Sequence, residues 1–202
     1  LVAKLISSLL TDAALYSGEM GFFGVIGWSP QWAGEGRSID SNAAGLRGLV
    51  GRVVEQVWGV WDVEEEQWIP DYPVVVSFTD GLQLEVCWQK FDELAIGWNS
   101  LVIDDRLIGD GERSLQWRPL NVPGFDLSSV RDAEVVDVVA AETLFQWRGI
   151  GDHSAEVGER WLSAGLWLRA ASGGIHIYNA LDENGVDNEA VQDGRYRMVP
   201  VA

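Results

Sequence analysis

The 202-residue sequence predicts a single α+β domain in which antiparallel β-sheet dominates and one or two short helices cover its edges. Three observations predict this fold class. Segments rich in valine and tryptophan recur along the chain, and both residue types favour strands. Two tight-turn signals, Asp80-Gly81 and Gly173-Gly174, separate pairs of such segments, as in β-hairpins. The same order of segments also occurs twice, which indicates two related units.

The first fifty residues are expected to form a helix, a short strand and a loop. Residues 1–16 carry leucines at helical spacing, which predicts a short amphipathic helix. The apolar residues 20–28 lie between glycines and favour a short strand. Residues 29–48 are rich in Gly, Ser, Ala and Asn, so we interpret them as a loop that carries Trp32. Because Leu1 is not an initiator Met, we expect an upstream segment or a tag to precede it.

Residues 49–103 are expected to form a first unit of one long strand, a hairpin and a further strand. The residues after Asp80-Gly81 alternate between apolar and polar side chains, which is typical of a half-buried antiparallel strand. The segments expected in this unit are a long strand (49–61), an acidic turn (62–67), two hairpin strands (74–78 and 82–88) and one more strand (94–98).

The pattern recurs over residues 130–187, after a connector (104–129) with a short helix expected near residues 126–132. Its strands are expected at 130–139, 165–170 and 175–178. The matched segments are 82 residues apart at Val53 and Val135, and 93 residues apart at Val74 and Trp167, which requires an insertion near residues 149–158. We interpret residues 49–103 and 130–187 as an internal duplication. The alternative is that two unrelated antiparallel meanders share the same pattern.

The charge of the chain favours some partners and excludes others. It carries 31 acidic and 14 basic residues, a formal net charge of −17. Such a surface repels phosphate backbones and anionic lipid, so we expect no nucleic acid and no membrane as partners. It attracts a basic protein and speeds the encounter with one. The alternative is that the acidity only keeps a tryptophan-rich protein soluble. No run of about 18 apolar residues predicts a membrane span.

Cys87 is the only cysteine, which excludes an intramolecular disulfide and a thiolate metal cluster. This fits a reducing compartment, so a cytoplasmic location is expected. The neighbours of Cys87 in the predicted strand are apolar, and we therefore expect a packed thiol of low reactivity.

The sequence contains no recognisable catalytic motif. His153 follows Asp152 in a loop-like stretch, but adjacency in sequence does not give the geometry of a general base, and His176 is expected to be a surface or satisfied sheet histidine. Neither a Gly-x-Ser-x-Gly turn nor a phosphate-binding loop occurs. The spacing in Asp182–Glu189 does not match a calcium loop, so we interpret it as an acidic surface turn. We expect no metal and no cofactor.

These observations favour a non-catalytic acidic binding protein that docks on a basic protein partner, as an immunity or inhibitor protein does. One alternative is a β domain that binds carbohydrate or a small ligand through some of its eleven tryptophans. The other is a hydrolase that uses two carboxylates. The contact residues expected for the leading hypothesis are an acidic run and two tryptophans in polar surroundings: Asp62, Glu64, Glu65, Glu66, Trp68 and Trp32.

Overall fold

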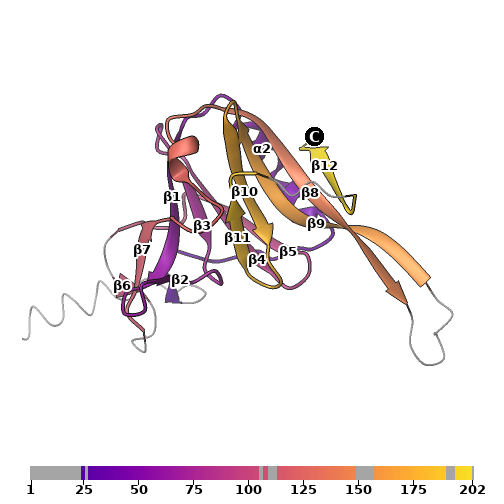
Figure 1. Cartoon of the computed structure of the whole chain (residues 1–202), viewed down its shortest axis with the longest axis horizontal. Helices are drawn as coiled ribbons and strands as arrows, with labels where there is room; N and C mark the ends of the chain where they lie inside the picture. Colours follow the sequence, from indigo (N-terminus) through magenta and orange to yellow (C-terminus); the bar gives the residue numbers. More distant parts are fainter. Residues whose placement is uncertain are drawn as a thin grey trace, which may run out of the picture.

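The computed structural model describes residues 24–25, 27–104, 107–108, 113–148, 157–189 and 194–201. Two antiparallel sheets make up most of these residues, with one α-helix and one 3-10 turn. Figure 1 shows how they are arranged. The predicted α+β class with dominant antiparallel sheet is therefore confirmed. The predicted helix over residues 1–16, most of the predicted strand over 20–28 and His153 lie outside the described residues.

The strands form two separate sheets in which all pairings are antiparallel. The first sheet has the order β5-β4-β3-β1-β7-β6, with β2 paired to β1, and the second has the order β11-β10-β9-β8-β12. The first sheet comprises β1 (Val54–Asp62), β2 (Gln67–Trp68), β3 (Val74–Phe78), β4 (Gln83–Gln89), β5 (Glu93–Trp98), β6 (Leu107–Ile108) and β7 (Leu115–Pro119). The second comprises β8 (Val135–Arg148), β9 (Val157–Ala170), β10 (Gly173–Asn179), β11 (Asn184–Asp187) and β12 (Tyr196–Pro200).

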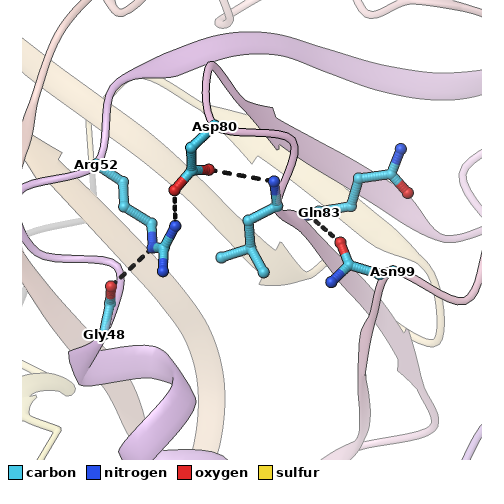
Figure 2. A network of polar contacts seen from close by, with 6 residues as sticks. Gly48, Arg52, Asp80, Gln83 and Asn99 are labelled. Carbon is cyan, nitrogen blue, oxygen red and sulfur yellow. Dashed lines mark hydrogen bonds and ion pairs between the residues drawn. The ribbon is translucent and has the colours of Figure 1, made fainter.

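The turn between β3 and β4 forms where the Asp-Gly signal predicted it. Gly81 has a φ of 86°, a conformation that glycine adopts without strain. The Asp80 carboxylate accepts a hydrogen bond from the backbone N–H of Leu82 and is ion-paired with Arg52, and Figure 2 shows this network. The Asn99 side chain accepts from the backbone N–H of Gln83 at 2.7 Å. The turn is therefore tied both to β5 and to the segment before β1.

The loop predicted over residues 29–48 is wrong, because Arg37–Arg47 form helix α2. The helix buries Ile39 and Leu46 in the core, and Ala43 packs against the same cluster. These three residues recur at helical spacing, but Ser, Asn and Gly between them have low helix propensity. Contact with the sheets therefore stabilises a helix that its local sequence does not favour.

The main hydrophobic core draws on both sheets and on α2. Its buried residues include Val57 and Val76 from the first sheet, Leu166 and Ile177 from the second, and Leu46 from the helix. A second cluster covers the other face of the first sheet and includes Trp28, Val60, Val75, Cys87 and Trp117. Burial raises the pKa of the Cys87 thiol to about 12, in line with the packed thiol of low reactivity expected from the sequence.

The two sheets repeat one strand order and one register. Trp58 pairs with Pro119, and Val139 pairs with Pro200, so both residues of the second pair follow their counterparts by 81 positions. The N–H of Val54 donates to the carbonyl of Ala133, and the N–H of Val135 donates to that of Arg52. The two bonds are equivalent under the same 81-residue shift, because Val54 corresponds to Val135 and Arg52 corresponds to Ala133. The Val53–Glu134 bridge lies between them.

An internal duplication, as predicted, requires such matching registers. The offset in the structure is 81 residues, one fewer than the 82 residues that separate Val53 from Val135 in the sequence match. The connector over 104–129 contains β6, β7 and a short 3-10 helix, Leu127–Ser129. β7 lies beside β1 as β12 lies beside β8. The first unit therefore gains β7 and the second gains β11 and β12, strands that the sequence pattern did not predict. The duplication itself stays a prediction about the origin of the chain.

Candidate functional site

The predicted acidic run forms a tight corner between β1 and β2, which we call the β1–β2 corner (residues 61–68). Trp61 pairs with Trp68 and Asp62 pairs with Gln67, so the run turns back on itself within six residues. The Asp62 carboxylate accepts hydrogen bonds from the backbone N–H groups of Glu64 at 2.9 Å and Glu65 at 3.1 Å. Asp62 is buried. Its carboxylate therefore stabilises the turn and is not free to contact a partner.

The three glutamates of the corner are exposed and differ in their partners. Glu64 accepts a hydrogen bond from the Ser114 hydroxyl at 3.0 Å, and Glu66 is ion-paired with Arg118 at 2.9 Å. Glu65 makes no ion pair with any residue that the structure describes. The corner therefore presents three carboxylates, two of which are oriented by contacts with neighbouring residues of the first sheet.

A hollow of about 440 Å³ lies on one side of the β1–β2 corner. Asp62, Glu64 and Glu65 line it together with Gln67 and Arg113. Three of the six predicted contact residues therefore surround one concave surface. Arg113 offsets part of their charge.

A second hollow of about 540 Å³ lies between the β1–β2 corner and the turn from β10 to β11, and we call it the junction hollow. The structure brings Glu66 and Trp68 together there with residues that the sequence analysis did not connect with them. The side chains that line the junction hollow include three aromatic residues (Trp61, Trp68 and Tyr178), two carboxylates (Glu66 and Glu183) and two amides (Asn121 and Asn184).

Glycines of the sheets make room for the aromatic rings of the junction hollow. A Cβ atom on Gly59 would lie 2.7 Å from the indole nitrogen of Trp68, so this indole packs directly against the strand backbone. The Tyr178 ring lies over Gly185, its partner across the β10–β11 pair, in the same way. Any larger side chain at either glycine would displace the ring that forms the wall.

Asp187 lies on β11 near Tyr178 of β10, two residues after Gly185, the residue that pairs with Tyr178. Burial raises the pKa of both groups, and the nearby Asp187 charge raises that of Tyr178 further.

Trp32 lies elsewhere. It is half-buried and packs against the cluster on the outer face of the first sheet. It lines neither of the two hollows. The structure therefore brings five of the six predicted contact residues to the β1–β2 corner and leaves Trp32 outside it.

The acidic surface turn predicted over Asp182–Glu189 is wrong at its centre, because Asn184–Asp187 form strand β11. Asn184 is 1% exposed, and its amide donates to the carbonyls of Pro70 at 2.7 Å and Tyr72 at 2.9 Å. Its side-chain oxygen accepts from the backbone N–H of Trp88. Asn184 therefore joins the two sheets at the base of the junction hollow. Within the described ranges, no three side chains of His, Cys, Asp or Glu gather to hold a metal ion.

His176 lies inside the second sheet, as predicted, but it is neither exposed nor hydrogen-bonded. It is 2% exposed, its ring stacks on Tyr178 with centroids 5.1 Å apart, and neither ring nitrogen has a hydrogen-bond partner among the described residues. Burial lowers the pKa of His176 to about 4. The imidazole is therefore neutral at neutral pH.

We expect the free energy of unfolding to decrease by about 3 kcal/mol as the pH falls from about 6.5 to about 4, because the unfolded chain binds a proton that folded His176 does not. Denaturant titrations across this pH range measure the effect. The His176→Phe variant keeps a flat ring on Tyr178 and should lack this part of the pH dependence. The raised pKa of Asp187 has the opposite effect and stabilises the folded protein as the pH falls. Because both the unmodified protein and His176→Phe contain Asp187, the difference between their pH profiles reports on His176 alone. Parallel pH profiles would contradict the assignment.

Comparison with known proteins gives no guide to the site, because no protein-family model, curated protein or solved structure matches the chain. Within the described part of the chain, no helix is long and apolar enough to cross a membrane.

Proposed function

We propose that the chain is a non-catalytic binding protein that docks on a basic protein through its β1–β2 corner, as an inhibitor or immunity protein does. The observation that carries this proposal is the placement of Glu64, Glu65 and Glu66 between two concave surfaces. Basic side chains of a partner can approach these carboxylates from either side. The net charge of −17 steers a basic partner toward the chain over a longer range.

Binding of an oligolysine peptide, measured by isothermal titration calorimetry at low and at high salt, tests this proposal. We expect binding at low salt that is lost at high salt, because salt screens interactions between exposed charges. The triple variant Glu64→Gln/Glu65→Gln/Glu66→Gln should reduce the affinity by about tenfold or more, which corresponds to about 1.4 kcal/mol.

A matched control removes the same number of charges elsewhere. Glu55, Glu134 and Glu189 are exposed and line neither hollow, so their triple exchange to Gln should leave most of the affinity intact. Equal losses in the two triple variants would show that net charge alone attracts the peptide. Binding that persists at high salt, or no binding at all, would also contradict docking through the corner.

A second candidate function, carbohydrate binding, is favoured by an exposed row of aromatic rings. Strands β8 and β9 continue beyond their neighbours as a two-stranded ribbon, which projects from the sheet in Figure 1. On it Phe145 lies 6.0 Å from Phe91 and 6.2 Å from Trp147, between ring centroids. Phe91 is 71% and Trp147 is 42% exposed. Such a strip offers flat apolar surface on which sugar rings can stack.

A panel of oligosaccharides distinguishes the two candidates. Quenching of tryptophan fluorescence that disappears in Trp147→Ala would favour the carbohydrate function. Within the described part of the chain, no observation favours the third hypothesis, a carboxylate hydrolase.

A further inference from the structure

The aromatic wall of the junction hollow presents ring carbon rather than hydrogen-bond donors. Trp61 and Trp68 come from the first sheet and Tyr178 comes from the second. The indole N–H groups of both tryptophans are buried and have no acceptor in the described part of the molecule. These donors are therefore turned away from the hollow. Aromatic rings carry negative potential on their faces, which attracts cations.

The charged residues of the junction hollow are acidic. Glu66 lies on the side of the β1–β2 corner and Glu183 lies on the side of the β10–β11 turn. The other polar side chains are amides, and the described residues that line the hollow include no Lys, Arg or His. A cation in the hollow would thus meet two carboxylates from different sheets, of which Glu66 is also ion-paired with Arg118. A carboxylate ligand would meet repulsion from both.

The hollow is large enough to admit one long side chain together with parts of its neighbours. At about 540 Å³ it lies within the range of sites for small ligands. Its walls also include the apolar residues Pro70, Val122, Pro123 and Val186. Lysine and arginine have an apolar stem and a charged head, so the stem can contact these walls while the head reaches a carboxylate.

We propose that the junction hollow binds one lysine or arginine side chain of the basic partner. This inference rests on the proposed function and names the group that the site recognises. The stem contacts the rings of Trp61, Trp68 and Tyr178, and the cationic head lies between Glu66 and Glu183. A neutral sugar fits less well, because the two indole donors that could orient it are buried.

Titration with n-butylammonium and n-butylguanidinium tests the inference, with 1-butanol as the neutral control of the same stem. Intrinsic tryptophan fluorescence and the indole N–H resonances report on Trp61 and Trp68. We expect both cations to bind saturably, with a Kd of about 1 to 10 mM, and butanol to bind at least about tenfold more weakly. Butanol that binds as tightly as the cations would overturn the inference, as would the absence of any saturable response.

The variant Glu183→Gln removes one charge from the hollow and should weaken cation binding by about fivefold. Glu189→Gln, which removes an exposed charge outside the hollow, is the matched control and should change nothing. Circular dichroism establishes that both variants fold.

The outcomes separate this inference from the proposed function. If oligolysine binds at the corner and Glu183→Gln leaves all binding unchanged, the inference fails and the docking function stands. If the small cations bind and oligolysine does not, the hollow is a site for small amines and the docking function fails.

Discussion

Replacing Glu85 by alanine is expected to lower the free energy of unfolding by about 3 kcal/mol, because this buried carboxylate has several hydrogen-bond donors to satisfy. Glu85 is completely buried on β4. It accepts hydrogen bonds from the backbone N–H of Ser100 at 2.6 Å, from the Ser100 hydroxyl, and from the backbone N–H of Leu101 at 2.8 Å. Its side chain lies over Gly97, where the missing Cβ leaves the necessary space. Alanine would leave the two backbone donors unpaired.

Thermal unfolding measures the loss, which corresponds to a decrease in Tm of about 10 °C for a chain of this length. The control is Glu55→Ala, which removes an exposed carboxylate from β1 and should change Tm little. Equal and small effects in the two variants would show that the bonds of Glu85 do not hold the segment after β5. Gly97→Ala should also destabilise the fold, since its Cβ would collide with Glu85.

The second large effect is expected at Asn184, the buried link between the sheets. Asn184→Leu introduces the residue type found at the corresponding position of the first unit, Leu94. Leucine cannot replace the bonds to Pro70, Tyr72 and Trp88, and we expect a loss of about 3 kcal/mol. Binding of n-butylammonium should weaken as well, because Asn184 lines the junction hollow.

Denaturant titration measures the loss of stability, and hydrogen exchange of the Trp88 amide reports on the broken link. The control is Asn99→Gly, which removes one exposed hydrogen bond to the backbone of Gln83 at a positive φ that glycine adopts without strain, and it should cost about 1 kcal/mol. If Asn184→Leu costs no more than this control, Asn184 does not join the sheets in the way described.

Local patterns in the sequence predicted seven of the strands and one turn, because these depend on neighbouring residues, but they did not predict β2, β6, β7, β11 and β12. Alternation of side chains and the Asp80-Gly81 signal identified β3 and β4. Helix α2 was missed, although Ile39, Ala43 and Leu46 have helical spacing, because the residues between them favour loops. The start of the first long strand was also misplaced, since Leu49 to Arg52 form a turn before β1.

Half of the candidate site could be predicted from the sequence and half could not. Glu64, Glu65, Glu66 and Trp68 form a continuous acidic and aromatic stretch, which local inspection detects. Tyr178, Glu183 and Asn184 lie more than 100 residues later, and only the packing of the two sheets brings them to the β1–β2 corner. No alternation of apolar and polar residues marks β11, in which Asn184, Gly185 and Val186 are all buried. The acidic residues around it instead suggested an exposed turn.

The central claim is that acidic and aromatic side chains from the two sheets meet at the β1–β2 corner to bind cationic groups. Mapping of NMR chemical-shift changes during titration with oligolysine tests it most directly. The account predicts changes confined to the β1–β2 corner and the junction hollow, including the resonances of Glu64, Glu65, Glu66, Trp68 and Gly185, which high salt reverses. Changes that gather instead at Phe145 and Trp147 on the β8–β9 ribbon, or that spread evenly over the acidic surface, would contradict it.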